Sequence, residues 1–194
     1  MSILQPPGSY SVKLSVSGRE LSAPLTIKKD PHSEGTEADI EQQTRMLEQL
    51  RADVETTAGM IDQLELARAQ LQSLARLLES DRDADLRKDA AAVEQKLTAI
   101  EGNLIELRST GRGQDTVRWG AKLLGKINYL ANGLASADNR PTSQQIDAQK
   151  VLEERISAYR GQIDAAGRSD VSALNDTLKR RNLPIVIWPA RTGT

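Results

Sequence analysis

An apolar stripe along residues 36–80 constrains the fold of this chain more than any other sequence feature. Its apolar residues recur at steps of three and four, which is the spacing of one face of an α-helix. Thr36 stands three residues before an acid, a pattern typical of a helix start. The segment therefore predicts one helix of about 44 residues, ~65 Å long at a rise of about 1.5 Å per residue. The stripe consists of Leu47, Leu50, Val54, Ile61, Leu64, Leu71, Leu74 and Leu78.

Three further segments have helical periodicity and predict partners for this long helix. The second helix is expected over residues 84–107, and the third carries an apolar side over residues 117–134 after the Gly-rich turn "STGRGQD". The fourth begins after Thr142, where Gln145 completes a second capping-box pattern. The stretch "AAGRSD" is expected to interrupt it, and a short fifth helix follows with Val171, Leu174 and Leu178.

The lengths of these helices predict how they pack. Short connections favour antiparallel neighbours, and residues 142–181 nearly match the long helix in length. We therefore expect residues 142–181 to fold back along the whole long helix. In this arrangement the fifth helix passes Leu47, Leu50 and Val54, and it brings the end of the chain near its beginning.

The first 35 residues follow a different period. Tyr10, Val12, Leu14 and Val16 alternate with polar residues, "SGRE" is a plausible turn, and the alternation resumes before Asp30. This pattern predicts a β-hairpin. Proline cannot donate to a β-ladder, so Pro24 indicates an edge strand or a bulge.

The predicted fold class is therefore mainly α: an antiparallel helical bundle of four main helices plus a short fifth, with an N-terminal β-hairpin. The expected parts are residues 1–35 (hairpin), 36–182 (bundle) and 183–194 (apolar C-terminal tail). The helical stripes also fit an intermolecular coiled coil. Alanines and extra apolar positions beside the stripes favour the intramolecular bundle.

Composition excludes several classes of function. The 194 residues carry a net charge of −1 with acids and bases interspersed, so no nucleic-acid partner is expected. No apolar run reaches the ~20 residues of a membrane span, so no membrane insertion is expected. The N-terminus lacks the features of a signal peptide, and the compartment stays undetermined. Cysteine is absent, which excludes disulfides and thiolate chemistry.

No catalytic, cofactor-binding or metal-binding constellation is predicted. Asp81, Asp83 and Asp85 have the spacing of a calcium loop, but Leu86 and Ala92 stand where that loop needs Gly and Glu. Helix capping explains these aspartates better. The single histidine, His32, lies in a connector and is expected to be an ordinary loop residue. Gly111 and Gly113 are expected to mark a turn. The basic residues Lys179, Arg180 and Arg181 suit the last turn of a helix.

Two segments are predicted to offer a partner-binding surface, the unpaired hairpin and the apolar tail. The tail residues Ile185, Val186, Ile187 and Trp188 are β-branched or aromatic. Two placements stay open for them. The tail either adds a third strand to the hairpin or closes the base of the bundle.

The order of these elements resembles the C-terminal region of bacterial sortilin-like, BNR-repeat β-propeller proteins, which are often labelled glycosyl hydrolases. Two later segments, "KLLGKINYLANGLASADNRPT" and "DVSALNDTLKRRNLPIV", resemble the third helix and the closing segment of that region. The residues that match its two strand motifs are Pro7, Gly8, Tyr10, Val12, Leu14, Pro24, Leu25, Ile27, Asp30 and Pro31.

This resemblance implies that the hairpin is the remnant of an Ig-like sandwich and that a protein partner or an upstream propeller domain lies beside it. It also implies export, as is general in that family. The Asp-box repeats of the propeller occur nowhere in the chain, so no propeller activity is carried over. The expected function is a non-catalytic accessory or structural helical module. The alternatives are a stand-alone coiled-coil adaptor or oligomerisation protein and, third, part of a glycosyl hydrolase whose catalytic propeller is missing.

Overall fold

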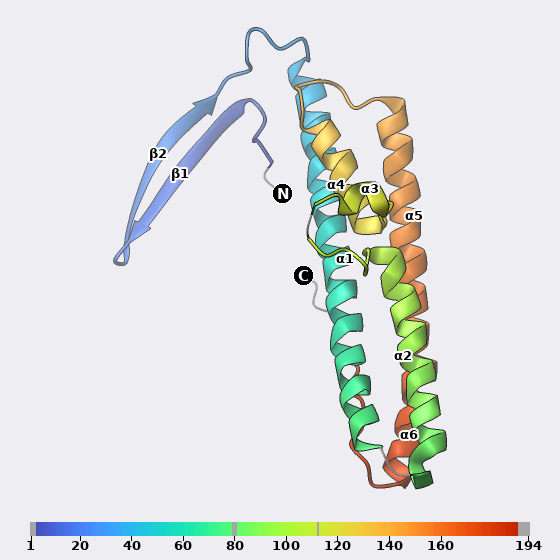
Figure 1. Cartoon of the computed structure of the whole chain (residues 1–194). Coiled ribbons are helices and arrows are strands. Elements are labelled where there is room, and N and C mark those ends of the chain that lie inside the picture. The colour runs from blue at the N-terminus through green and yellow to red at the C-terminus, as the bar shows by residue number, and fades with distance from the viewer. Residues whose placement is uncertain (1–2, 79–80, 112, 190–194) are drawn as a thin grey trace. The chain divides into compact units, whose positions relative to one another are not determined.

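The computed structural model describes residues 3–78, 81–111 and 113–189. The fold is mainly α, with helices following one antiparallel β-hairpin (Figure 1), which confirms the predicted fold class. The chain forms two compact units. The first contains Met1–Ala52 and Tyr129–Gln149, and the second contains Asp53–Asn128 and Lys150–Thr194.

The hairpin of the first unit has the predicted strands. β1 (Gly8–Val16) and β2 (Arg19–Ile27) pair along their full length, from Gly8 opposite Ile27 to Val16 opposite Arg19. The loop between them has two residues, Ser17 and Gly18, with φ of 50° and 78°. Positive φ at both positions is the geometry of a type I′ turn, whose twist matches that of the strands. Pro24 lies opposite Ser11 without a bulge.

Helix α1 (Glu37–Leu77) begins in the first unit at the predicted capping box. The backbone N–H of Asp39 donates to Thr36 Oγ1 at 3.2 Å, and the N–H of Thr36 donates to Asp39 Oδ2 at 3.1 Å. Hydrogen bonds from the Thr36 side chain and backbone lower the pKa of the Asp39 carboxyl. The first turn of α1 is therefore satisfied by its own sequence, as the spacing predicted.

The connector between α4 (Leu123–Leu134) and α5 (Ser143–Ala166) lies against the start of α1 within the first unit. The Gln43 side chain donates to the carbonyls of Leu134 and Ala137. At Gly35 an added Cβ would lie 2.0 Å from the Asp138 carbonyl oxygen, so only glycine allows this approach. The capping box that begins α5 is also confirmed, with Thr142 N–H to Gln145 Oε1 at 2.9 Å and Gln145 N–H to Thr142 Oγ1 at 3.2 Å.

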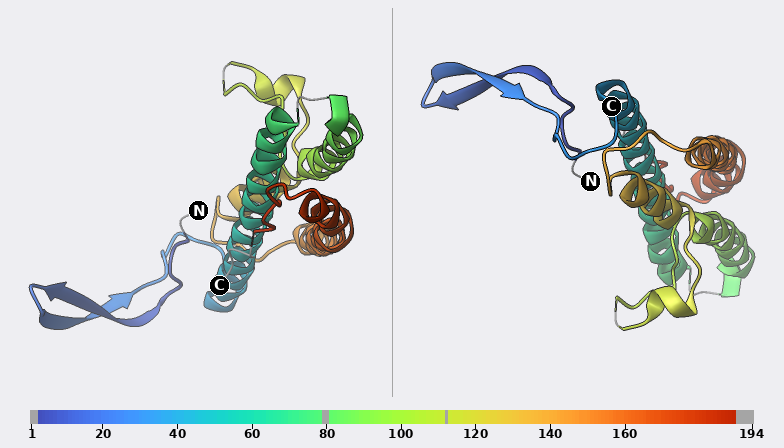
Figure 2. Two further views of the ribbon diagram at one scale, coloured as in Figure 1. Left: turned by 90° about the horizontal axis from the view of Figure 1, so that it is seen from below. Right: turned by 90° about the horizontal axis from the view of Figure 1, so that it is seen from above.

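The second unit is built on the later part of α1, on α2 (Ala84–Leu104) and on a helical column that contains residues 150–166 of α5, the π-helical turn η2 (Gly167–Val171) and α6 (Ser172–Arg180). Seen end-on, these three columns lie at the corners of a triangle (Figure 2). The buried aliphatic residues on their facing sides include Leu64, Leu71, Leu74, Leu78, Leu86, Leu97, Ile100, Leu104, Ile156, Ile163, Leu174 and Leu178.

Polar contacts give the directions of these columns. Arg68 of α1 binds Glu101 of α2, and Arg87 of α2 donates to the Leu78 carbonyl oxygen at 2.9 Å, so α1 and α2 run antiparallel. Lys96 of α2 binds Asp170 at 2.6 Å, and Asp83 receives Arg181 at 3.4 Å, so α2 and the η2–α6 segment also run antiparallel. In the second unit α1 and the η2–α6 segment therefore run parallel to each other, and both run antiparallel to α2. The expectation that residues 142–181 fold back against the long helix is thus wrong in direction.

Four further expectations about the helices are wrong. The predicted third helix over residues 117–134 is broken. A four-residue helix α3 (Asp115–Arg118) is followed by extended backbone at Trp119, and α4 starts only at Leu123. Val117 is exposed, because it lies on this short helix and outside the apolar side of α4. The predicted second helix ends three residues early, at Leu104.

The interruption expected at "AAGRSD" is absent. Residues 167–171 form a π-helical turn that joins α5 directly to α6. One glycine is tolerated in a helix interior at a modest cost, and the neighbouring packing offsets it here.

The expected place of the fifth helix is also wrong. Its counterpart α6 packs beside the start of α2 in the second unit, as the Arg181–Asp83 ion pair shows. Leu47 and Leu50 belong to the first unit and are buried there, whereas α6 belongs to the second unit. Val54 is half-buried. In the first unit the end of α4 lies beside α1, where Gln43 reaches the Leu134 carbonyl.

Candidate functional site

The C-terminal tail segment, residues 183–189, docks on the helices of the second unit. Two side-chain carboxamides bind its backbone in both directions. Asn175 of α6 donates to the Val186 carbonyl and accepts from the Val186 N–H, each at 2.8 Å. Gln70 of α1 donates to the Ile187 carbonyl and accepts from its N–H, also at 2.8 Å. Each carboxamide thus pairs with a peptide as a neighbouring β-strand would.

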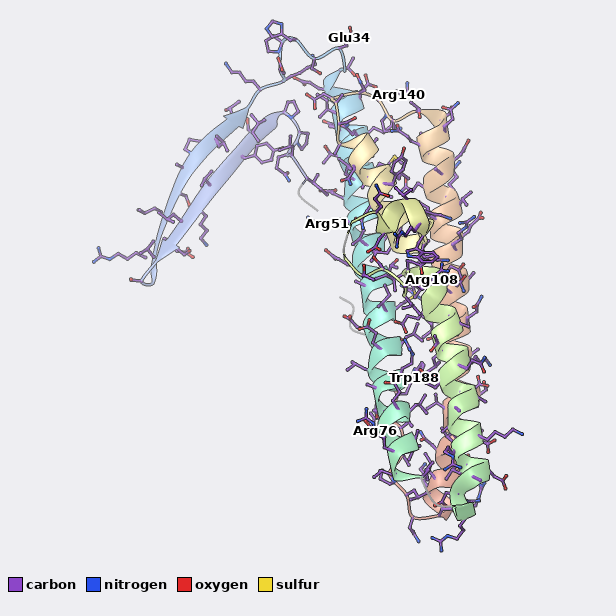
Figure 3. The ribbon with its side chains drawn as sticks, in the orientation of Figure 1. Glu34, Arg51, Arg76, Arg108, Arg140 and Trp188 are labelled. Carbon is purple, nitrogen blue, oxygen red and sulfur yellow. The ribbon has the colours of Figure 1, made fainter. Side chains whose placement is uncertain are left out.

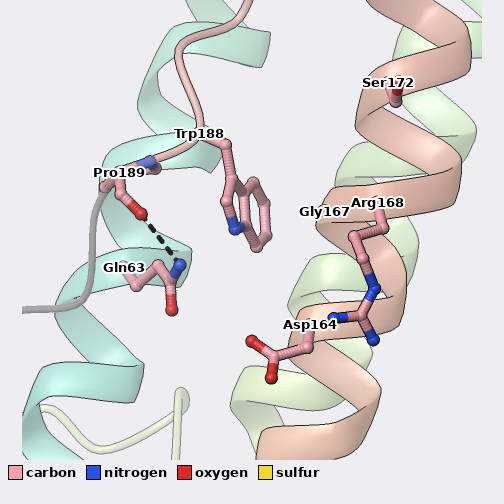
Figure 4. A pocket seen from close by; sticks show the side chains of 7 residues that line it. All are labelled: Gln63, Asp164, Gly167, Arg168, Ser172, Trp188 and Pro189. Carbon is pink, nitrogen blue, oxygen red and sulfur yellow. Dashed lines mark hydrogen bonds between the residues drawn. The ribbon is translucent and has the colours of Figure 1, made fainter.

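The aromatic end of the tail segment lies between α1 and the α5–η2 column. The Trp188 side chain projects from the tail toward Gly167, and Gln63 of α1 donates to the Pro189 carbonyl at 2.9 Å (Figures 3 and 4). A Cβ added at Gly167 would lie 2.5 Å from the Trp188 ring. Asp164 and Arg168 line the open side of the hollow beside this ring. The absence of a side chain at Gly167 is therefore what lets the indole seat.

The four predicted site residues divide into two pairs. Val186 is 2 % exposed and Trp188 is half-buried, so these two anchor the tail segment. Ile185 and Ile187 are exposed. Ile185 lines a groove between the tail segment and α1, together with the exposed Leu66 and Leu77 of α1. Of the two placements left open above, the third strand is wrong for the described residues, because the sheet contains β1 and β2 and the tail lies on helices.

The hairpin provides a second apolar surface. Residues directly opposite each other in an antiparallel pair point to the same face, so the register joins Leu14 to Leu21, Val12 to Ala23 and Tyr10 to Leu25 on one face. We call this set, with Val16, the hairpin face. Four of its side chains are more than half exposed: Val12 at 51 %, Leu14 at 54 %, Val16 at 56 % and Leu21 at 68 %.

A buried charge cluster joins α1 to α2. The Arg68 guanidinium binds both Glu101 and Glu94, and it donates from Nε to Glu94 Oε1 at 3.1 Å. The Glu101 side chain is only 2 % exposed. Burial raises the pKa of the Glu94 carboxyl, but hydrogen bonds from Gln72, Arg68 and Thr98 outweigh burial and lower it overall. Both carboxylates thus bind the same guanidinium, that of Arg68.

A second charge cluster occupies the loop between α2 and α4. Glu106 binds Arg108 through Oε1 at 2.6 Å, and the Arg108 guanidinium lies 3.9 Å from the centre of the Trp119 ring. The labelled Arg108 lies beside α3 (Figure 3). This cation–π stack accompanies the extended backbone at Trp119, where a helix was predicted.

We expect the Glu106 carboxyl to titrate with a pKa of about 2 in the folded protein, because hydrogen bonds from the Arg108 side chain lower it from 4.5. A lowered folded pKa stabilises the fold above the unfolded pKa, and this contribution is lost as pH falls from about 4.5 toward 2. Side-chain carboxyl NMR measures it directly. Arg108→Ala should move the midpoint back toward 4.5, whereas a midpoint that stays low in this variant would contradict the assignment.

The other candidates from the sequence do not assemble into a reactive site. Asp83 stands at the start of α2 but makes no capping hydrogen bond, which corrects that expectation, and its carboxylate binds Arg181 instead. The side chain of Asp81 lies outside the described residues. His32 donates its backbone N–H to Asp30 in a turn, as an ordinary loop residue does. In the described ranges no three His, Asp or Glu residues gather as a metal site requires.

Several residues that position these surfaces were not predicted, although the pattern contains a signal for some. Arg68 and Glu101 each occupy a stripe position, four residues after Leu64 and Leu97 respectively. A charge on a buried stripe requires a partner, so the two could have been paired from the sequence. Gln70 and Asn175 carry no such signal, because the sequence does not show which exposed carboxamides meet a tail.

Comparison with known protein families, curated proteins and solved structures finds no match to this chain. Among the described residues, no helix combines the length and the apolar character needed to cross a membrane.

Proposed function

We propose that this protein is a non-catalytic accessory module that binds another protein chain through its hairpin, with the helices as a rigid support. The observation that carries the proposal is the hairpin face, on which Val12, Leu14 and Leu21 are each more than half exposed. An isolated two-stranded hairpin is marginal in water, and an exposed apolar face marks a protein-binding surface.

The resemblance to the tail of sortilin-like propeller proteins supports a β-rich partner, such as a propeller protein or its Ig-like sandwich. Strand motifs of that kind end a sandwich, and the hairpin offers the same two strands with an uncovered apolar face. The partner then supplies the apolar surface that covers this face.

The charge clusters support the non-catalytic part of the proposal. A glycosidase needs two carboxyl groups beside a substrate cleft, and one of them must keep a raised pKa. Glu94 and Glu101 are carboxylates that converge on one place, but both bind Arg68, and the pKa of Glu94 is lowered. This arrangement suits a structural link between two helices.

One observation favours the coiled-coil adaptor as a second candidate. Leu66 and Leu77 on α1 are 54 % and 64 % exposed. If these leucines form a helix–helix interface, Leu66→Ser with Leu77→Ser lowers the molecular mass in solution while hairpin substitutions leave it unchanged.

Site-specific photo-crosslinking in the producing cells tests the proposal. A photoreactive residue at Leu14, on the hairpin face, should give adducts whose protein chain mass spectrometry identifies. The matched control places the same residue at Ser22, on the opposite face of the hairpin. Equal yields from the two positions would contradict binding through the hairpin face.

A further inference from the structure

The two outer edges of the hairpin differ in their ability to pair. In a two-residue type I′ hairpin the residues that flank the loop, Val16 and Arg19, form a hydrogen-bonded pair, and the pairs then alternate along the ladder. Ser11 and Pro24 therefore form a non-hydrogen-bonded pair, so their backbone nitrogens point away from the hairpin.

This geometry explains how β2 tolerates Pro24. The missing N–H of Pro24 belongs to the outer edge of β2, and the ladder with β1 loses no hydrogen bond. Proline on an edge strand blocks the addition of a further strand there. The outer edge of β2 is therefore closed near its middle.

The outer edge of β1 is open. The residues whose N–H and C=O groups point outward along it are Ser9, Ser11, Lys13 and Ser15. None of these residues is a proline. Three of them are serines, and Lys13 is the one charged residue among the four. The strand is nine residues long without a bulge.

We propose that the outer edge of β1 pairs antiparallel with β1 of a second copy of this chain. The inference rests on the proposed function and names an additional partner for the same hairpin. In the register that pairs the whole strand, Gly8 lies opposite Val16 of the second copy, and Ser11 lies opposite Lys13. About eight main-chain hydrogen bonds then form, because four residues on each strand face outward.

The side chains agree with this register. Lys13 faces the small hydroxyl of Ser11, so the two lysines never stand directly opposite each other, which would be unfavourable. A shift by one pairing step toward the turn would place Lys13 opposite Lys13. On the other face Tyr10 meets Leu14 and Val12 meets Val12, and the two hairpin faces join on the same side of a four-stranded sheet.

Such an interface is mainly an edge contact, smaller than that of a permanent dimer, so we expect a concentration-dependent dimer with a Kd between about 1 µM and about 1 mM. Sedimentation of the full chain over that range measures it. Hydrogen exchange of the unmodified protein at high concentration should protect the amides of Ser11 and Lys13, but not those of Ser22 and Thr26 on the edge of β2.

Two matched substitutions separate the edges. Ser11→Pro and Ser22→Pro each place proline at a non-hydrogen-bonded position of the hairpin, the class that Pro24 already occupies. Ser11→Pro should raise the Kd at least tenfold, and Ser22→Pro should change it less than threefold. Ser11→Glu, opposite Lys13, should lower the Kd severalfold, while Ser11→Lys should raise it.

A mass of one chain at every concentration, or equal effects of the two proline variants, overturns the β1 pairing. These results leave the proposed function standing if crosslinks from Leu14 still identify another protein. Loss of those crosslinks in a chain that still dimerises through β1 overturns the proposed function and leaves the β1 pairing intact.

Discussion

Arg68→Ala is expected to lower the free energy of unfolding by about 3–5 kcal/mol, since removing one partner of a buried ion pair leaves the other charge buried without compensation. The carboxylate left behind is Glu101, whose side chain is 2 % exposed. Chemical denaturation followed by circular dichroism measures the change.

Two controls distinguish this charge cluster from an ordinary salt bridge. Lys96→Ala removes the ion pair with Asp170, in which the Lys96 side chain is 52 % exposed, and it should cost less than about 1 kcal/mol. The double variant Arg68→Met with Glu101→Leu should recover most of the stability, because it removes both charges and keeps the volume. An Arg68→Ala loss no larger than that of Lys96→Ala would show that Glu101 is not stabilised by Arg68.

Gly167→Ala is expected to displace the tail segment from the second unit. Its new Cβ would lie 2.5 Å from one atom of the Trp188 ring and 2.6 Å from another, and a rigid ring cannot bend away as a flexible side chain would. Overpacking of this kind costs about 1–3 kcal/mol. The direct readout is hydrogen exchange at the Val186 and Ile187 amides, which bind Asn175 and Gln70 and should lose at least tenfold in protection.

The chain contains a matched control for this substitution. Gly161 lies in the interior of α5, and an added Cβ there meets nothing within 4 Å. Gly161→Ala should therefore stabilise the protein by about 0.5–1 kcal/mol, through helix propensity alone, and leave the tail amides protected. Unchanged protection of Val186 and Ile187 in Gly167→Ala would mean that the indole does not seat against this glycine.

The parts of the fold that depend on local patterns could be predicted from the sequence. The capping boxes at Thr36 and Thr142 need only residues three apart, and both form as expected. The hairpin needs only alternation and a two-residue turn, and its strands match. In each case the interacting groups are neighbours in the chain, so no tertiary contact decides the outcome.

The parts that depend on distant contacts could not be predicted. Trp119 lies in extended backbone, and its ring stacks against Arg108, which is eleven residues earlier in the chain. Gly167 reads as a helix breaker, yet the Trp188 ring fills the space beside it and the helix continues through a π turn. Helix lengths alone are compatible with more than one arrangement of the helices. The prediction that placed α6 beside Leu47 rested on those lengths.

Pro24 sets a limit on growth. A hairpin with two open edges can add copies on both sides without end, and such sheets extend into fibres. Here the outer edge of β2 lacks a backbone donor at Pro24. Strand pairing that begins at the outer edge of β1 therefore stops after one further copy has been added. One imino acid thus makes self-association of this sheet finite, and it protects a chain with uncovered leucines and valines from amyloid-like extension.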